Sequence, residues 1–271
     1  MTTPYLILGS GYTGRRVAQS LRALGRTVIE FRTAAHNGSL PFDILDPATH
    51  VHLTNALAPG ARILYSLPVL RTPAGYQPTA PTAAPLLNRA TRVVYLSTTG
   101  VYGDLHHVNE TTPPSPRHQR ESLRLEEEQT LAAGPWSTLI LRPAAIYGPA
   151  RGVHQSMLEG RYRLPGDGSN FISRIHVDDL AAHCLAALDS PLTGAFPVAD
   201  AHPCPARDIA AFCAELLHVP MPEFTERLPG DDTRRANRQV DGSAIRRALS
   251  LTLRYPSYRE GIPASLHPQP A

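Results

Sequence analysis

Short apolar runs alternate with segments of helical spacing over the first 150 residues of this 271-residue chain. The apolar runs are typical of buried strands and lie at residues 5–8, 27–31, 61–67, 92–97 and 136–141. Residues 15–24 and 121–133 have the spacing and composition of helices. Strands that alternate with helices predict an α/β fold, in which a doubly wound parallel sheet is covered by helices on both faces.

The pattern becomes less regular after residue 149. Helices are expected at residues 178–188 and 206–217, and a short strand at residues 195–199. Two proline-rich stretches, residues 68–85 and 108–118, are expected to be irregular. We therefore predict a main domain over residues 1–149 and a smaller subdomain over residues 150–271, interleaved with a late strand and helix of the main domain.

Composition narrows the range of functions. A net charge of +3, without any run of five basic residues, argues against nucleic acid and membrane surfaces as partners. Three cysteines without metal-ligand or disulfide spacing, and no apolar run of ~18 residues, indicate a soluble cytoplasmic protein with no metal site. A loose basic stretch contains Arg234, Arg235, Arg238, Arg246 and Arg247. We interpret it as a solvated helix face or as partners in ion pairs, in preference to a nucleic-acid-binding patch.

The chain contains no lysine, because all 26 residues in the Lys+Arg count are arginines. A Schiff-base lysine, a lysine-bearing phosphate loop and a Tyr-x-x-x-Lys proton relay each need an ε-amine, so all three are excluded.

A glycine-rich segment carries the strongest functional signal. It reads Gly9-Ser10-Gly11-Tyr12-Thr13-Gly14 and fits G-x-G-x-x-G, directly after the first expected strand and at the start of the first expected helix. The first glycine permits a tight turn, the second lets the backbone approach a pyrophosphate, and the third allows close packing of helix and strand. Free N–H groups at the helix N-terminus attract the anion. The segment predicts a dinucleotide-binding turn.

The end of the second expected strand distinguishes NADP from NAD. An acidic residue there binds the ribose 2′-OH of NAD, whereas an arginine accommodates the 2′-phosphate of NADP. Glu30 and Arg32 both lie near this end, and strand alternation favours Arg32 as the terminal residue that faces the ribose. Arg15 and Arg16 add positive charge beyond the glycines. NADP(H) is therefore the preferred cofactor, and NAD(H) is the alternative.

Further motifs follow the glycine turn in a characteristic order. They are Asp43-Ile44, Leu96-Ser97-Thr98-Thr99-Gly100-Val101-Tyr102-Gly103, Arg142-Pro143-Ala144-Ala145-Ile146-Tyr147-Gly148-Pro149 and Ile175-His176-Val177-Asp178-Asp179-Leu180. Over residues 4–220 the chain resembles the extended short-chain dehydrogenase/reductase superfamily, in its epimerase/dehydratase branch. The Tyr-Thr-Gly-Arg continuation of the glycine turn is similar to the atypical bacterial group called YeeZ-like.

The resemblance implies a Rossmann fold with a small C-terminal substrate subdomain, and a nicotinamide nucleotide across the carboxyl edge of the sheet. Asp43 is then expected beside the adenine. The other residues expected to complete the cofactor site are Leu67, Ser97, Arg142 and Pro143.

The resemblance breaks down at the catalytic pair. In active members of the superfamily a Tyr-x-x-x-Lys pair and a Ser/Thr transfer protons while the nicotinamide moves hydride. Here no tyrosine or lysine occurs between Gly103 and Gly134. Alignment places His118 at the tyrosine position and Ser122 at the lysine position, and Thr98 stands for the Ser/Thr.

Three interpretations follow. His118 replaces the tyrosine as acid/base, because imidazole suits proton transfer at neutral pH, and Arg120 or Arg124 supplies positive charge only. Alternatively, Tyr102 or Tyr147 acts from elsewhere, or the site binds cofactor without hydride chemistry. His176 and Asp178 are expected to organise a loop and cap the following helix.

We therefore expect an NADP(H)-dependent oxidoreductase or epimerase that acts on an unidentified small molecule, with Thr98, His118 and Tyr102 as candidate catalytic residues. The alternative is a non-catalytic NADP(H)-binding redox sensor or regulatory protein. Related proteins often dimerise through helices beside the sheet, so a homodimer is compatible with the resemblance.

Overall fold

The computed structural model describes residues 4–36, 38–226 and 236–267. Its central element is a seven-stranded sheet of order β14-β9-β7-β4-β1-β2-β3. The strands are β1 (Tyr5–Leu8), β2 (Val28–Arg32), β3 (Leu40–Pro41), β4 (Ala61–Tyr65), β7 (Ala90–Leu96), β9 (Ser137–Pro143) and β14 (Gly194–Val198). The chain runs outward from β1 to β3 and then returns to β4 on the other side of β1, which is the Rossmann order. The predicted α/β class is confirmed.

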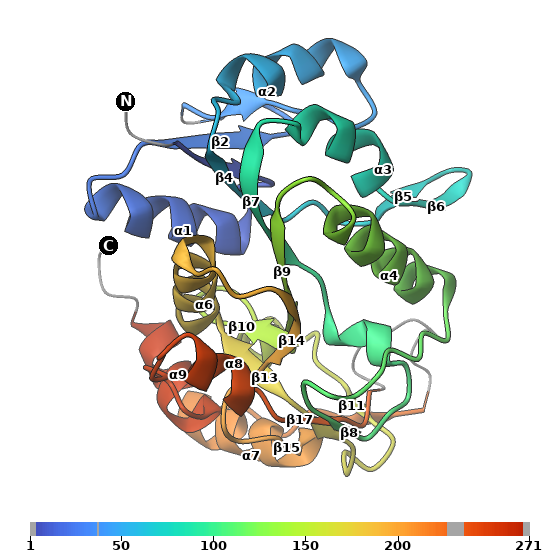
Figure 1. Ribbon diagram of the computed structural model, residues 1–271. Coiled ribbons are helices and arrows are strands. Elements are labelled where there is room, and N and C mark those ends of the chain that lie inside the picture. The colour runs from blue at the N-terminus through green and yellow to red at the C-terminus, as the bar shows by residue number, and fades with distance from the viewer. Residues whose placement is uncertain (1–3, 37, 227–235, 268–271) are drawn as a thin grey trace. The chain divides into compact units, whose positions relative to one another are not determined.

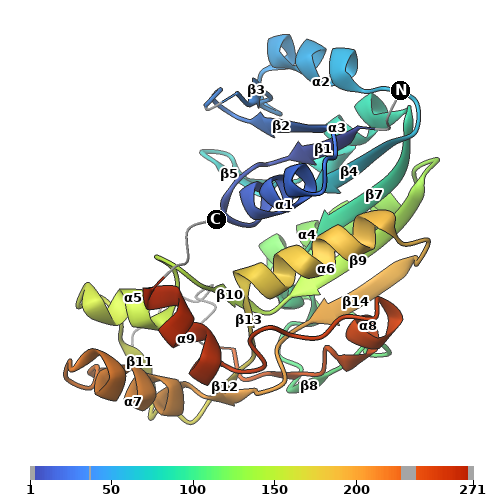
Figure 2. The same cartoon turned by 90° about the vertical axis from the view of Figure 1, so that its left-hand side faces the viewer.

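Helices cover both faces of this sheet. They include α1 (Tyr12–Ala23), α2 (His50–Ala56), α4 (Gln119–Ala132) and α6 (Val177–Asp189). Figure 1 shows α1 to the left of the sheet and α4 to its right, and in Figure 2 the same α1 lies in front of the strands. Helix α1 packs through Val17, Ala18 and Leu21, which recur at helical spacing and are buried. Among the described residues, no helix has the length and apolarity needed to span a membrane.

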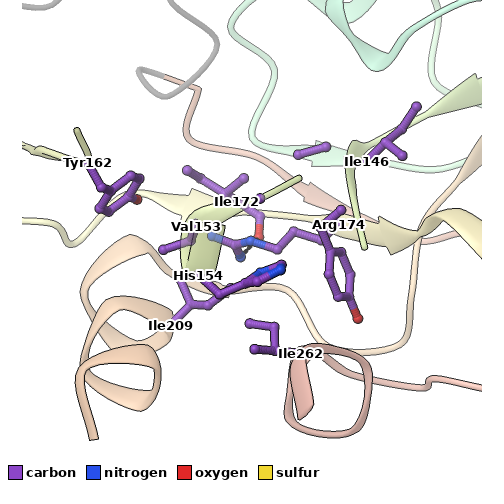
Figure 3. Close-up of a pocket in the computed structure, with 11 residues that line it drawn as sticks. Ile146, Val153, His154, Tyr162, Ile172, Arg174, Ile209 and Ile262 are labelled. Atoms are coloured by element: carbon purple, nitrogen blue, oxygen red, sulfur yellow. Dashed lines mark hydrogen bonds between the residues drawn. The ribbon is translucent and has the colours of Figure 1, made fainter. Parts of the chain in front are cut away.

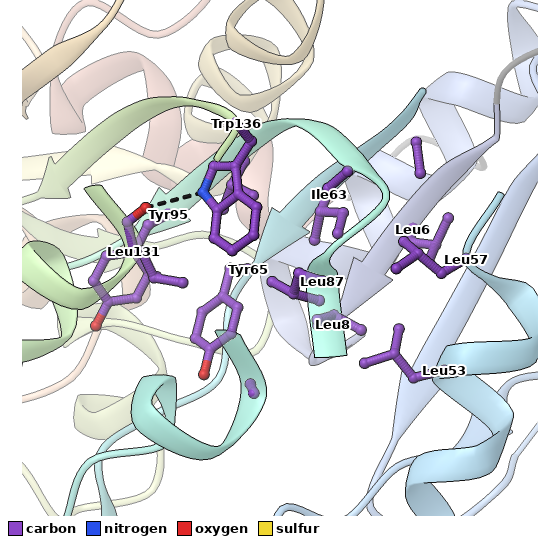
Figure 4. Packing of buried hydrophobic residues seen from close by; sticks show 14 of the residues in the cluster. Leu6, Leu8, Leu53, Leu57, Ile63, Tyr65, Leu87, Tyr95, Leu131 and Trp136 are labelled. Carbon is purple, nitrogen blue, oxygen red and sulfur yellow. Dashed lines mark hydrogen bonds between the residues drawn. The ribbon is translucent and has the colours of Figure 1, made fainter. Parts of the chain in front are cut away.

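The apolar core of the sheet comes from the runs that the sequence indicates (Figure 4). Leu6, Leu8 and Ile63 are fully buried, and the rings of Tyr65 and Tyr95 meet edge to face with centroids 5.6 Å apart. Trp136 is anchored by its Nε1, which donates to the carbonyl of Leu131 at 2.9 Å.

The proline-rich stretch at residues 68–85 corrects one prediction. It holds a hairpin of β5 (Leu70–Thr72) and β6 (Gly75–Gln77), followed by α3 (Ala80–Ala83). Pro73 and Pro78 fall outside the paired residues, and Pro81 lies in the first turn of α3, where a missing N–H costs no hydrogen bond. Prolines at such places bound short elements and leave them intact.

The chain forms two compact units. The first comprises Met1–Val101, Pro116–Arg142 and Ala181–Phe196, and the second Tyr102–Ser115, Pro143–Leu180 and Pro197–Ala271. The chain therefore passes between the units more than once. The single sequence boundary between residues 149 and 150 stays a prediction.

The second unit is built from short strand pairs and helices. The pairs are β10 (Ala145–Tyr147) with β13 (Arg174–His176), β12 (Phe171–Ile172) with β15 (Cys204–Pro205), β11 (Leu164–Pro165) with β16 (Phe224–Thr225), and β17 (Gln239–Val240) with β8 (His107–Val108). The helices are α5 (Val153–Leu158), α7 (Ala206–Leu217), α8 (Ser243–Ala248) and α9 (Tyr258–Leu266). Their apolar core includes Tyr147, Met157, Ile209, Tyr258 and Ile262.

The basic stretch is only partly a solvated face. Arg238 is buried and donates to the carbonyls of Gly103 and Leu105, so the prediction of a solvated position is wrong for this residue. Arg246 donates to the carbonyl of Ala199 at 2.6 Å. Arg247 is exposed, and Arg234 and Arg235 lie outside the described residues.

Candidate nucleotide-binding and catalytic site

The glycine turn follows β1, at the point in the sheet where the order of strands reverses. The N–H groups of Gly9 and Ser10 both donate to the carbonyl of Phe31, at 3.1 and 3.0 Å, which fixes the turn to the end of β2. Gly9 has a φ of +89°, and a Cβ there would lie 2.8 Å from the carbonyl oxygen of Ser66. Only glycine fits both the conformation and the space.

The other two glycines of the motif differ in their surroundings. A Cβ on Gly14 would lie 2.8 Å from the carbonyl oxygen of Gly9 and 3.0 Å from Ile7, so this glycine allows α1 to pack against β1. A Cβ on Gly11 would meet only the Gly9 oxygen, at 4.0 Å, and would otherwise stand in open space. This open space fits the close backbone approach of a pyrophosphate.

No side chain among the described residues neutralises the partial positive charge at the N-terminus of α1. Gly11 is the N-cap and gives no side-chain cap, and the turn holds no acidic residue. Tyr12 stacks under the guanidinium of Arg16, 4.4 Å from the ring centroid, while Thr13 is buried. Arg15 is exposed, and its Nε donates weakly to the carbonyl of Gly11 at 3.4 Å. The residues present therefore fit the diphosphate of a dinucleotide.

The side chains of Glu30 and Arg32, at the end of β2, differ in their hydrogen-bond and ion-pair partners. Glu30 accepts a hydrogen bond from the hydroxyl of Ser10 and pairs with Arg22 at 2.6 Å. Arg32 is half-buried, and its side chain makes no hydrogen bond or ion pair within the described residues. The two are two residues apart and share a face of the strand, so alternation alone does not separate them. Their partners do, because both carboxylate oxygens of Glu30 are engaged, by Ser10 and Arg22, whereas the guanidinium of Arg32 is uncommitted within the described residues.

Asp43 and Leu67 border the turn in different ways. Asp43 follows β3 and accepts the N–H of Leu45 at 2.9 Å through Oδ1, which orders a local turn. Leu67 follows β4, and its Cδ2 would be 3.3 Å from a Cβ on Gly9. Leu67 is therefore beside the glycine turn. Contact of either residue with a cofactor stays a prediction.

Ser97 and Arg142 share a buried carboxylate that the sequence analysis missed. Ser97 follows β7 and donates to Glu128 of α4, and Arg142 on β9 donates to both oxygens of Glu128, with Nη2 at 2.6 Å. All three residues are buried, as is Pro143. The side chains of Ser97 and Arg142 thus join strands to α4, whatever their part in cofactor binding.

The neighbouring residue, Glu127, centres a second buried network. Its carboxylate accepts hydrogen bonds from the hydroxyl of Tyr95, from Thr79 and from Arg124, the last at 3.2 Å. Arg124 also donates to Tyr95 at 2.7 Å and to the carbonyl of Leu67 at 3.1 Å. Burial, opposed by the charge of Arg124, raises the pKa of Tyr95 well above its usual value. Arg124 is committed to this network and is not a free substitute for the missing lysine.

His118 and Thr98 lie in one neighbourhood of the first unit. His118 is exposed and is the N-cap of α4, where its N–H donates to Glu121 at 3.2 Å. Glu121 is also close to Gly100, because a Cβ on Gly100 would lie 3.8 Å from its Cγ. The N–H of Gly100 donates to Thr98 Oγ1 at 3.0 Å, so the Thr98 hydroxyl keeps its own proton for another acceptor. Ser122 donates to the carbonyl of His118 at 3.3 Å.

The remaining candidates belong to the second unit and are buried. Tyr102 is fully buried, and Tyr147 donates to the carbonyl of Ser257 at 3.2 Å. Burial raises the pKa of Tyr147. His176 Nδ1 accepts the N–H of Asp178 at 3.2 Å at the start of α6, as expected for a residue that organises a loop. Asp179 accepts the N–H groups of Arg254 and Tyr255, so the Ile175–Leu180 segment has structural partners.

The comparisons with known proteins agree with this geometry. The model of the NAD dependent epimerase/dehydratase family matches residues 5–198. The chain is 30% identical over 151 residues to 3-diazoavenalumate denitrifying reductase of a Streptomyces species, covering 51% of this chain and 50% of the reductase. It is 30% identical over 174 residues to Protein YeeZ of Escherichia coli strain K12, covering 63% of this chain and 61% of YeeZ. The matches thus span between half and two thirds of these curated relatives.

A solved structure extends the likeness over nearly the whole chain. A conserved protein of unknown function from Silicibacter pomeroyi superposes with a TM-score of 0.75 at 28% identity, covering 98% of this chain and 99% of that one. The resemblance to the epimerase/dehydratase branch, drawn from the motifs, is confirmed. This chain belongs to the NAD-dependent epimerase/dehydratase family.

Proposed function

We propose that this protein is an NADP(H)-dependent oxidoreductase or epimerase that works without the Tyr-x-x-x-Lys pair, using Thr98 and His118 instead. One observation carries the cofactor part of the proposal. The glycine turn is fixed through the carbonyl of Phe31 to the end of β2, where Arg32 has uncommitted donors. Family membership supports the enzyme class, and one of the relatives is named a reductase.

NADP(H), when bound, would give or accept a hydride at its nicotinamide ring. The backbone of Gly11 and the start of α1 would hold the diphosphate, and Arg32 the 2′-phosphate. The hydroxyl of Thr98, whose oxygen already accepts the N–H of Gly100, would donate its own proton to the substrate oxygen. His118, exposed at the N-cap of α4, would give or take the proton.

The cofactor assignment is tested by fluorescence titration of the full chain with NADPH and NADH. Loss of a charge-assisted contact costs about 1.5–3 kcal/mol, so Arg32→Gln should weaken NADPH binding by roughly ten- to a hundredfold and leave NADH nearly unchanged. Arg71→Gln, an exposed arginine on β5, is the matched control and should change neither. Equal losses for both nucleotides, or tighter NADH binding by the unmodified chain, would contradict the preference for NADP(H).

The acid/base assignment is tested by turnover of NADPH with a broad panel of carbonyl compounds. Once a substrate is found, His118→Gln should lower kcat by about 10²–10⁴-fold and remove the corresponding limb of the pH–rate profile, with NADPH affinity unchanged. Thr98→Val should also lower kcat. His107→Gln, an exposed histidine on β8, should have no effect. An unchanged kcat and pH profile in the His118 variant would remove His118 from the mechanism.

One observation favours a second candidate, a non-catalytic NADP(H)-binding redox sensor. Ser122 stands at the lysine position and the nearby Arg124 is bonded to Glu127, which leaves the exposed Arg120, and an arginine can supply charge but cannot relay a proton as lysine does. A sensor predicts no turnover on any carbonyl, together with clearly different affinities for NADP and NADPH. Indistinguishable affinities for the two would exclude the redox-sensor form.

A further inference from the structure

The second unit encloses a cavity that no motif of the sequence indicates. It has a volume of about 90 Å³ and lies among β10, α5, β12, β13, α7 and α9, all within that unit (Figure 3). Its walls are largely aliphatic and include Ile146, Val153, Ile172, Ile209 and Ile262. Two nitrogen-rich side chains, Arg174 and His154, also line it. An apolar chamber with a few polar groups is typical of small-molecule sites.

Arg174 is a buried cation with spare donors. Its exposed fraction is 4%. Nη1 donates to the carbonyl of Ile172 at 2.7 Å and to Cys204 Sγ at 3.3 Å. Nε and Nη2 make no hydrogen bond within the described residues, and no carboxylate there lies within ion-pair distance of the guanidinium. A buried charge without a bonded counter-ion is costly, and Asp200, the buried acid that interacts with Arg174 at longer range, is itself held toward its neutral form by burial, so an anion at this edge would be favoured.

His154 adds a second unsatisfied group to the same cavity. Its exposed fraction is 1%, and neither ring nitrogen makes a hydrogen bond of normal geometry. Burial lowers the pKa of His154, and the backbone near Gly148 opposes this shift only in part. The ring fits against Gly152, where a Cβ would lie 3.2 Å from Nδ1. A buried polar group of this kind is satisfied by a ligand or by water.

We propose that this cavity binds a small organic acid with an apolar body. The carboxylate would pair in bidentate fashion with Nε and Nη2 of Arg174, an edge whose spacing matches two carboxylate oxygens. His154 would share a hydrogen bond with one of these oxygens, and the aliphatic walls would contact the body of the acid. All of these residues belong to the second unit, so this site is independent of the proposed NADP(H) site.

The test uses hexanoate and benzoate as probes on the full chain, with hexanamide and benzamide as neutral isosteres. Isothermal titration should show saturable binding of at least one acid, at least about tenfold tighter than its amide. The imidazole NMR signals of His154, assigned from a His154→Gln spectrum, should shift on addition of that acid. Equal binding of acid and amide, or no saturable binding of either acid, would mean that water satisfies these groups and would overturn the proposal.

Variants place the binding in this cavity. Arg174→Gln should weaken acid binding at least about tenfold, whereas Arg163→Gln, a more exposed arginine of the same unit, should leave it unchanged. Arg174 also bonds to Ile172 and Cys204, so circular dichroism checks that its variant is folded. If the variant is unfolded, Ile209→Trp decides, because it fills the cavity while leaving Arg174 in the chain. Undiminished binding in a folded Arg174→Gln or in Ile209→Trp would overturn the site. The NADPH titration of the unmodified chain reports separately on the proposed function.

Discussion

Three consecutive glutamates on α4 show how differently one residue type is used. Glu126 is exposed, whereas Glu128 is buried and accepts hydrogen bonds from Ser97 and Arg142. Removing one partner of a buried ion pair leaves the other charge uncompensated. We expect Glu128→Gln to lower the free energy of unfolding by roughly 3 kcal/mol and Glu126→Gln to change it by less than about 0.5 kcal/mol, measured by urea denaturation. Similar effects of the two variants would show that the buried pair contributes little.

The sequence identified Ser97 and Arg142 but not the carboxylate that holds them. Motif resemblance points to these two residues as cofactor contacts, and the structure shows their side chains bonded to Glu128, 31 and 14 residues away. An arginine on a buried strand needs a counter-charge, and the acidic helix was the available source. Nothing in the local pattern tells which of three adjacent glutamates faces inward. Orientation around a helix is fixed by packing, and the helix here has too few apolar residues to reveal its buried face.

At the scale of elements, the glycine turn offers a matched pair of substitutions. A Cβ on Gly14 would lie 2.8 Å from a backbone oxygen, whereas a Cβ on Gly11 would meet open space. Gly14→Ala should therefore destabilise the fold by about 1–3 kcal/mol, because helix and strand must move apart. Gly11→Ala should leave the free energy of unfolding nearly unchanged and weaken NADPH binding at least about tenfold, because the side chain occupies the approach to the backbone.

Denaturation and fluorescence titration of the same two variants check this contrast. A Gly11→Ala variant that binds NADPH as the unmodified chain does would show that the nucleotide does not approach this backbone. A stable Gly14→Ala variant would mean that α1 shifts at little cost. These two outcomes can be distinguished, because the first is a result on NADPH binding and the second is a result on the packing of α1.

The long elements of the first unit could be predicted, and the short ones of the second could not. Buried strands such as β7, and helices such as α7, carry their signal within one continuous run, and α7 begins and ends where the sequence placed it. The strands of the second unit are two or three residues long, too short for any periodicity. The cavity residues come from six elements spread between Ala145 and Ile262, so only the folded chain brings them together.

At the scale of the whole molecule, the absence of lysine makes arginine the only long cation available for interior roles. Among the described residues, the buried arginines are Arg92, Arg142, Arg174 and Arg238. Arg92 donates to the carbonyl of Ala187 through Nε and Nη2, and Arg238 holds the loop at Gly103 and Leu105. A guanidinium can satisfy several carbonyls or a carboxylate at once through its planar fork, which an ammonium does less well. Arg174 differs from the other three because its guanidinium lines the cavity and only its Nη1 is hydrogen-bonded within the described residues.

The pH dependence of the molecule's stability should reflect one buried acid, Asp200. Burial raises the pKa of Asp200 from 3.8 to about 7, although the N–H of His202 and the charge of Arg174 favour its ionised form. Between these two values the folded chain holds a proton that the unfolded chain releases. The free energy of unfolding must therefore fall as the pH rises through this window, with the full penalty present above about pH 7.

Asp200→Asn keeps the shape and the acceptor for His202 but removes the charge. One pKa unit corresponds to about 1.4 kcal/mol, so the variant should gain roughly 4 kcal/mol over the unmodified chain near pH 8 and almost nothing near pH 4, seen as a gap in thermal midpoint that widens with pH. Asp241 is the control of opposite sign, because hydrogen bonds from Ser243 lower its pKa. Asp241→Asn should destabilise the chain near pH 8, and this loss should shrink as the pH falls below about 4. A pH-independent gain in the Asp200 variant would mean that repacking, rather than relief of a buried charge, stabilises it.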